Sequence, residues 1–358
     1  MKYFLFLSVV VSSFLAQAGQ MQKADFIKAY SDFAFAQYQQ SLTTAQALKV
    51  AVDSFVANPT QKTQDAAKTA WVEARKAYLP TEVLRFAEGP IDREGGPEGF
   101  INSWPLDEAS IDYVIGNKEA GIINDKSIPE ITKEILLDLN QKAGETNVTT
   151  GYHAIEFLLW GQDVSAKGPG NRSFKDYIVG HKENADRRGQ YLKVATEILV
   201  GHLQDLVTAW DPVRADSYYN FMLSPENTDA QTKIIFEALA KFTGEELSQE
   251  RMFVAYDTQS QEEEHSCFSD TTHLDFIYDF VGVQKLLNSG MLSLVSASSP
   301  DLKASIESSA RITEQAIADI PVPFDQAILN EQGRKKILKA ITGLEQLAEG
   351  LRKAVGQL

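Results

Sequence analysis

The stretch YLKVATEILVGHLQDLVTAW, residues 191–210, decides the fold class of this 358-residue chain. Its apolar residues follow one another at steps of three or four positions: Leu192, Ala195, Leu199, Leu203, Leu206 and Trp210. Such steps place one continuous apolar stripe on a helix with 3.6 residues per turn. The segment therefore predicts an amphipathic helix with one buried face.

The same spacing recurs towards both ends of the chain. One further stripe lies near the N-terminus and another near the C-terminus: Phe26, Tyr30, Phe33, Ala36, Leu48, Val52 and Phe55; Ile337, Ile341, Leu344, Ala348, Leu351 and Val355. The sequence shows no sustained alternation of period two, which half-buried strands would require. We therefore expect an all-α protein made of two helical-bundle domains packed against each other.

Glycine and proline mark the places where these helical patterns are interrupted. The segment GQDVSAKGPGNRS, residues 161–173, predicts a boundary between an N-terminal domain over residues 19–170 and a C-terminal domain over residues 171–358. The segment AEGPIDREGGPEGFINSWP, residues 87–105, is too long for an ordinary connection between helices. Loops of this kind often carry functional residues.

The first residues have the composition of an export signal. Residues 1–20 read MKYFLFLSVVVSSFLAQAGQ, with one lysine, an apolar run and Ala-Gln-Ala before Gly19. This order is typical of a secretory signal peptide that is cleaved after residue 18. We therefore expect the mature protein to be exported.

The charge balance limits the partners of the chain. It has 34 basic and 49 acidic side chains, a net charge of −15. A nucleic-acid-binding protein needs clustered Lys and Arg, so this class is excluded. The acidic field favours cationic partners, including metal ions.

The segment GYHAIEFLLWGQD, residues 151–163, sets His153 and Glu156 three positions apart among apolar residues. On a helix both side chains project from one face. Imidazole and carboxylate together are ligands for iron, zinc or manganese. The alternative is a polar pair that is hydrogen-bonded inside a helical core. Helical zinc-peptidase motifs are excluded, because Ala154 follows the histidine and Phe157 follows the glutamate.

A second group of candidate residues lies in WVEARKAYLPTEVLRF, residues 71–86. Trp71, Arg75, Tyr78 and Glu82 follow at steps of four, three and four, so they share one helix face. Buried Arg and Glu side chains need partners. Arg75 and Glu82 are therefore predicted either to pair across a contact between the domains or to line a binding site.

A third group lies in QEEEHSCFSDTTHLDF, residues 261–276. This segment concentrates carboxylate and imidazole side chains: Glu262, Glu263, Glu264, His265, Asp270 and His273. Their density favours a metal-binding or ligand-binding wall, and the alternative is an acidic, solvated loop. A ferritin-type di-iron centre is disfavoured, because only Glu262 and His265 have the Glu-x-x-His spacing.

Together these stretches resemble the imelysin-like family, and within it the iron-regulated protein A branch. The Gly-x-His-x-x-Glu motif at Gly151, His153 and Glu156 carries the resemblance together with the stripe that begins at Trp71. Three further segments match that branch: GFINSWPLDEASIDYV (99–114), NADRRGQYL (184–192) and EEEHSCFSDTTHLDF (262–276). The likeness spans essentially the whole chain after the signal peptide.

The resemblance implies two helical bundles with a shared site near their contact. It also implies a periplasmic location, with peripheral outer-membrane association, and a link to iron acquisition and to other iron-uptake components. The resemblance further implies that His153 and Glu156 are metal ligands. Our leading hypothesis is an exported iron-uptake accessory that binds a metal ion, iron or alternatively zinc, or a metal-bearing ligand in a crevice between the domains. Seven residues are candidate walls of that crevice: Arg75, Tyr78, Glu82, Glu264, His265, Asp270 and His273. The alternative hypothesis is a metallopeptidase that uses His153 and Glu156.

Overall fold

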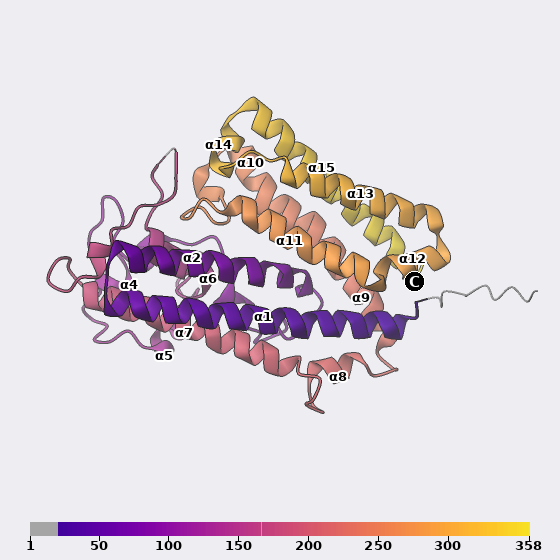
Figure 1. The fold of residues 1–358 in the computed structure, drawn as a ribbon, viewed down its shortest axis with the longest axis horizontal. Helices are drawn as coiled ribbons and strands as arrows, with labels where there is room; N and C mark the ends of the chain where they lie inside the picture. Colours follow the sequence, from indigo (N-terminus) through magenta and orange to yellow (C-terminus); the bar gives the residue numbers. More distant parts are fainter. Residues whose placement is uncertain (1–20, 166) are drawn as a thin grey trace, which may run out of the picture.

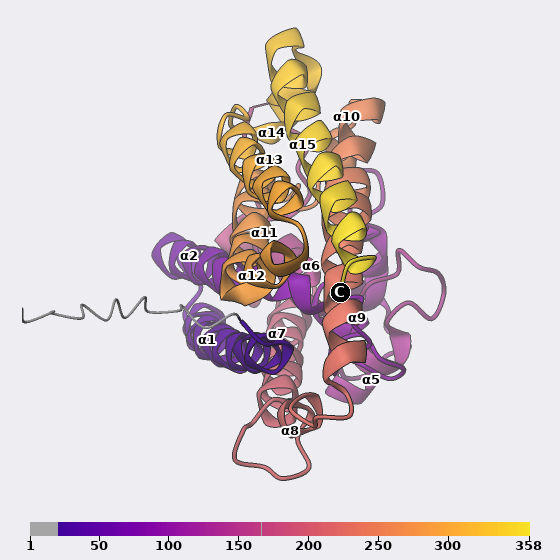
Figure 2. The same ribbon diagram turned by 90° about the vertical axis from the view of Figure 1, so that its right-hand side faces the viewer.

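The computed structural model of the protein describes residues 21–165 and 167–358, and it contains no strand within them. The predicted signal peptide, residues 1–18, lies outside the described residues. The expected all-α fold is confirmed. Two layers of helices lie one above the other in Figure 1. In Figure 2, α1 of the lower layer is seen nearly end-on, whereas α15 of the upper layer runs obliquely down the picture.

The lower layer in Figure 1 is built from the first half of the chain. Its long helices are α1 (Lys23–Ala57), α2 (Gln61–Tyr78) and α7 (Ala185–Ala209). The shorter elements of the same half are η1 (Leu79–Leu84), α3 (Glu98–Ile101), η2 (Glu108–Ser110), α4 (Gly121–Asn124), α5 (Lys133–Leu139), α6 (Gly151–Trp160), η3 (Phe174–Tyr177) and α8 (Tyr218–Met222).

The upper layer contains the second half of the chain. It begins with one long helix formed by α9 (Thr228–Lys241), the π-helical segment η4 (Phe242–Phe253) and α10 (Val254–Thr258). The remaining elements are η5 (Gln261–Glu263), α11 (Thr272–Leu286), η6 (Leu287–Met291), α12 (Leu292–Ser298), α13 (Pro300–Ala318), α14 (Phe324–Leu329) and α15 (Glu331–Val355).

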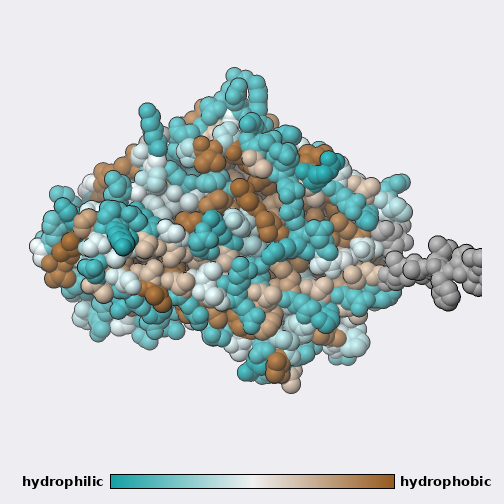
Figure 3. Space-filling model, in the orientation of Figure 1, coloured by the Kyte–Doolittle hydropathy of each residue, from teal (hydrophilic) through white to brown (hydrophobic). Residues whose placement is uncertain are grey.

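The apolar stripes of the sequence form the core. Their residues on α1, α7 and α15 are largely buried, and one continuous cluster of apolar side chains extends through both layers. Burial of this surface is the main favourable contribution to folding. The face seen in Figure 3 carries mostly hydrophilic residues with small hydrophobic patches between them.

The division into domains at residue 170 stays a prediction. The helices before and after residue 170 pack against each other in the same layer. Helix α7, which was assigned to the C-terminal domain, packs against α1 and α6 of the lower layer. The contacts of α7 favour a boundary after α8 instead.

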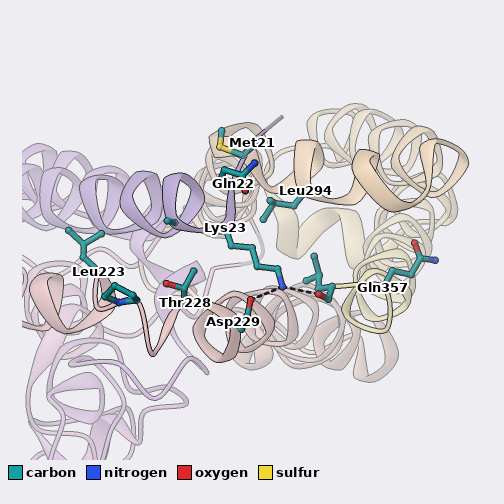
Figure 4. Close-up of a pocket in the computed structure, with 11 residues that line it drawn as sticks. Met21, Gln22, Lys23, Leu223, Thr228, Asp229, Leu294 and Gln357 are labelled. Atoms are coloured by element: carbon teal, nitrogen blue, oxygen red, sulfur yellow. Dashed lines mark hydrogen bonds and ion pairs between the residues drawn. The ribbon is translucent and has the colours of Figure 1, made fainter. Parts of the chain in front are cut away.

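The two ends of the described chain meet beside α9. The Lys23 ammonium group donates hydrogen bonds to Asp229 Oδ1 and to the carbonyl oxygen of Leu358, each over 2.8 Å (Figure 4). These contacts connect α1 of the lower layer to α9 and to the C-terminal residue. Within the described chain, no helix combines the length and apolar character needed to cross a membrane.

Candidate functional site

The Gly-x-His-x-x-Glu motif forms the first turns of α6, every residue of which is buried. Gly151 begins the helix with φ of +85°, and a Cβ atom there would lie 2.4 Å from the carbonyl oxygen of Ile101. Only glycine fits this position without strain. The helix so placed holds His153 and Glu156 at the junction of the two layers, exposed by 1% and 0%.

His153 and Glu156 bind each other. His153 Nδ1 lies 3.1 Å from Glu156 Oε2. The other carboxyl oxygen, Oε1, accepts hydrogen bonds from the backbone N–H of Ser269 over 2.9 Å and from its hydroxyl over 2.6 Å. Glu156 thereby connects α6 to the loop before α11, which also carries His265.

The protonation of this pair follows from its burial. Burial raises the pKa of Glu156 to about 8. The pKa of His153 is far below its ordinary value because of burial and, secondarily, because of His265. At neutral pH the carboxyl O–H of Glu156 therefore donates to His153 Nδ1. The second ring nitrogen of His153, Nε2, is buried and has no hydrogen-bond partner in the described residues.

A second histidine lies against the first. The ring centroids of His153 and His265 are 4.8 Å apart. His265 Nδ1 donates to Asp275 Oδ2 over 2.8 Å, and this same oxygen lies 3.3 Å from Nη2 of Arg75. Burial works against the charge of Asp275, but Arg75 and His265 outweigh it and hold the pKa of Asp275 well below its usual range.

His265 is neutral at physiological pH. Burial and, after it, the Arg251 guanidinium group lower the pKa of His265 to about 4, although Asp275 acts in the opposite direction. Because Nδ1 of neutral His265 carries the proton that it donates to Asp275, Nε2 has a free lone pair. Imidazole nitrogens in this state are good metal ligands.

A second buried charge network adjoins the histidines. Arg251 of η4 binds Glu82 of η1, and it also contacts Asp279 of α11 over 2.9 Å and Glu246 over 2.8 Å. Arg85 lies 3.1 Å from Glu82 and 3.0 Å from Glu246. The pair of Arg75 with Asp275 and the network around Arg251 therefore both connect the lower layer to the upper layer through paired charges.

A cleft of about 320 Å³ opens beside these networks. Its wall includes residues of the loop after η1, of the segment before α6, of η4 and of the loop before α11: Arg85, Glu98, Asn102, Ser103, Trp104, Pro105, Gln141, Glu145, Glu246, Glu250, Arg251 and His265. The volume is at the lower end of the range for small-molecule sites. His265 stands in the wall, and His153 lies behind it.

The structure brings together part of the predicted set. Arg75 of α2 pairs with Asp275 of α11, and Glu82 of η1 pairs with Arg251 of η4, so both side chains find partners in the other helical layer. Tyr78 is fully buried, with its ring centroid 5.0 Å from that of Tyr152.

Of the seven predicted wall residues, His265 alone lines the cleft. Arg75, Tyr78 and Glu82 are buried and do not reach its lining, and the other three, Glu264, Asp270 and His273, are also absent from it. Glu264 is buried and accepts a hydrogen bond from the Thr272 hydroxyl over 2.9 Å. Asp270 belongs to a different acidic group, since burial and the neighbouring Asp163 and Asp325 raise its pKa to about 7. His273 is half-buried in the first turn of α11 and is absent from the cleft lining. These three residues shape the loop that carries His265.

The donor groups fit a metal ion only in part. In the described chain, no three His, Cys, Asp or Glu side chains are arranged to hold an ion. Both carboxyl oxygens of Glu156 are engaged by Ser269 and His153. His265 Nε2 offers a lone pair directly, whereas His153 Nε2 carries the ring proton as long as the Glu156 O–H donates to Nδ1. His153 becomes a ligand only when Glu156 gives up its proton and accepts from Nδ1–H, and the remaining ligands of a metal would have to come with it.

The sequence reasoning missed several residues of the site. Arg251, Asp275, Asp279 and Asn102 are all buried charged or polar side chains in or next to the cleft. One signal was available: Asp275 and Asp279 are four positions apart, each directly before a phenylalanine, so both fall in an apolar stretch with helical spacing, where unpaired carboxylates are unfavourable.

Comparison with known proteins gives a consistent result. A family model described as Imelysin matches residues 34–351. "Iron-regulated protein A" of Synechococcus elongatus is 24% identical over 329 residues, which cover 87% of this chain and 79% of the relative.

A solved structure has the same fold. The crystal structure of a protein provisionally described as an iron-regulated protein A precursor, from Parabacteroides distasonis, aligns with a TM-score of 0.73 at 18% identity. The alignment covers 95% of this chain and 97% of the other.

Proposed function

Because this chain belongs to the imelysin family, we propose that it is an accessory protein of iron uptake that binds a metal-bearing ligand in the cleft beside His265. The iron-related names of its relatives support the biological setting. The cleft between the layers supports binding rather than catalysis, since the motif residues behind it are buried and hydrogen-bonded to each other.

One observation carries this proposal: the Nε2 atom of His153 is buried and has no partner in the described part of the chain. A buried polar atom without a hydrogen bond costs free energy, so such atoms call for an explanation. Here it lies behind a cleft wall that also presents His265. A ligand that reaches both imidazoles would satisfy this atom.

The incomplete donor set favours a metal complex over a bare ion. Two imidazoles supply two ligands, whereas iron and zinc need four or more. A chelate that leaves two coordination positions open brings the missing donors itself. Iron is the metal that the names of the relatives suggest, and imidazole also suits zinc.

Titration with ferric nitrilotriacetate, a chelate with open coordination positions, tests the proposal. We expect saturable binding by the mature protein, followed by calorimetry and by the ultraviolet–visible spectrum. His265→Ala and His153→Ala are each expected to weaken binding at least tenfold. His181→Ala, which removes an exposed histidine, is the matched control and leaves binding unchanged.

Two outcomes would overturn the proposal. One is equal or absent binding by all four proteins. The other is chelator-sensitive cleavage of a peptide library that is lost in Glu156→Gln, which would establish the metallopeptidase alternative instead.

Export is the second part of the proposed function. It rests on residues 1–20, whose order of charged, apolar and small residues is that of a signal peptide. Expression of the full chain in a Gram-negative host, fractionation and intact-mass measurement test it. We expect a periplasmic protein that begins at Gly19, whereas an unprocessed cytoplasmic chain would contradict export.

A further inference from the structure

This inference rests on the proposed function. We infer that the cleft prefers metal complexes with a net positive charge, accepts neutral ones such as ferric nitrilotriacetate, and rejects anionic ones. The inference comes from the balance of charges on the cleft wall and from the way its arginines are already paired. It names the class of ligand that the proposed site would take.

The wall of the cleft carries more acidic than basic groups. Four carboxylates line it, from Glu98, Glu145, Glu246 and Glu250, against the two guanidinium groups of Arg85 and Arg251. Glu145 and Glu250 are exposed residues of this lining, whereas Glu98 and Glu246 are partly buried. Carboxylates that surround a recess focus a negative potential into it.

Both arginines of the wall are neutralised from within the protein. Arg251 contacts Asp279 over 2.9 Å and also binds Glu82, and neither of these carboxylates lines the cleft. Arg85 lies 3.1 Å from Glu82. An anionic ligand would therefore have to compete with buried carboxylates for each guanidinium group, which is unfavourable.

The wall also contains one imidazole, that of His265. Its Nδ1 is engaged by Asp275 Oδ2 over 2.8 Å, so Nε2 is the ring nitrogen left for a ligand. Asn102 and Trp104 complete this part of the wall with neutral groups.

Glu246 keeps its charge in the folded protein. Burial works against ionisation, but Arg251 and Arg85 outweigh it and lower the pKa of Glu246. Burial raises the pKa of Asp279 and of Glu98, so Glu82 and Glu246 balance the two arginines. The negative excess of the cleft therefore comes from the exposed Glu145 and Glu250. The overall charge of −15 acts in the same direction.

A pair of inert octahedral complexes of opposite charge tests the inference. Hexaamminecobalt(III) is a trivalent cation and hexacyanocobaltate(III) a trivalent anion, and both are small enough for a cleft of about 320 Å³. Neither exchanges its ligands on the time scale of a titration, so binding reports charge and not coordination by histidine. Chemical shifts of backbone amides at the cleft and calorimetry give site and affinity.

Variants separate the cleft from the general acidity of the surface. Glu145→Gln/Glu250→Gln removes two exposed carboxylates of the cleft. Glu307→Gln/Glu314→Gln removes two exposed carboxylates of α13 and changes the net charge equally. We expect the cation to bind wild type and the α13 variant alike, and the cleft variant about fivefold more weakly. The anion is expected not to bind.

The outcomes separate this inference from the proposed function. Binding of the anion at the cleft, or equal weakening of cation binding in both double variants, would overturn the charge selectivity. If ferric nitrilotriacetate still binds in that case, the proposed function stands. If neither ferric nitrilotriacetate nor hexaamminecobalt(III) binds, both fail.

Discussion

Glu156 has three hydrogen-bond contacts that a protonated carboxyl group satisfies completely. One oxygen accepts from the backbone and hydroxyl of Ser269, and the other donates its proton to His153. A glutamine reproduces this pattern, because its carbonyl oxygen accepts and its amide group donates. In this structure Glu156 positions His153 and the loop of His265.

Replacement of Glu156 by glutamine and by alanine tests this positioning role. We expect Glu156→Gln to keep the stability of the wild type at pH 7 but to weaken ferric nitrilotriacetate binding, because its amide donates to Nδ1 of His153 and keeps the ring proton on Nε2. Glu156→Ala leaves buried donors unpaired and a cavity, so it should lower the free energy of unfolding by about 2–4 kcal/mol. Urea unfolding and calorimetric titration measure both. A folded Glu156→Gln variant that binds as tightly as the wild type would show instead that His153 Nε2 is not a ligand.

Glu156 also makes stability depend on pH in a defined direction. Its pKa is raised by burial from 4.5 to about 8, so the folded protein keeps a proton that the unfolded chain releases between these values. The contribution of this group to the free energy of unfolding therefore falls as the pH rises from about 4.5 to about 8. The Tm of Glu156→Gln should match the wild type near pH 5 and exceed it by several degrees near pH 9. A Tm difference that is constant across this range would contradict the raised pKa.

The sequence predicted the proximity of His153 and Glu156 but not their role. Their spacing on one helix face is a local property, so it is visible in the chain. Ser269, which donates two hydrogen bonds to Glu156 Oε1, lies 113 positions further on. Such a tertiary contact leaves no periodic pattern in the sequence, and neither do the pairs of Arg251 with Glu82 and Asp279.

At the scale of elements, the helices were predictable because their apolar stripes are regular. The stripes on α1, α7 and α15 correspond to buried faces. The partners of each helix were not predictable, and α7 packs with the lower layer although the clearest glycine-rich break precedes it. Glycine and proline mark turns, but a turn does not separate domains when the next helix folds back on the same core.

Two turns of the lower layer share a sequence that the helical periodicity does not reveal. Residues 112–119 read DYVIGNKE, and residues 176–183 read DYIVGHKE. They are neighbours in space, because the Tyr113 hydroxyl donates to Asp176 and the Lys182 ammonium lies 4.3 Å from the centre of the Tyr113 ring. The first aspartates of the two repeats, Asp112 and Asp176, nevertheless differ from each other in their surroundings.

The two aspartates of this repeat give a matched pair of variants. Asp112 is fully buried and binds Arg172 over 2.6 Å and Arg188 over 2.6 and 2.9 Å. Asp112→Asn leaves two buried guanidinium groups undercompensated, so we expect a loss of about 3–5 kcal/mol in the free energy of unfolding. Asp176→Asn keeps a hydrogen-bond acceptor for Tyr113 and should cost about 1 kcal/mol. Equal losses in urea unfolding would show that the turns, not the arginine pairs, determine stability.

For the whole molecule, the decisive feature is that charges join the layers at the same place where the cleft opens. Arg75 of α2 binds Asp275 of α11, and Glu82 of η1 binds Arg251 of η4. All four side chains are exposed by 3% or less. An apolar core also extends through both layers, so we expect them to unfold as one unit.

Glu82→Gln tests whether the layers are coupled in this way. The substitution removes the carboxylate that Arg251 and Arg85 share, and breaking a buried pair of this kind costs about 3–5 kcal/mol. If the layers unfold together, native-state hydrogen exchange should show the same loss of protection in α1 and in α15. Glu331→Gln, which breaks the exposed pair with Lys335, is the control and should cost less than about 0.5 kcal/mol. Protection that falls in α1 but persists in α15 would show instead that each layer folds on its own, and that the cleft between them forms only when two independent units dock.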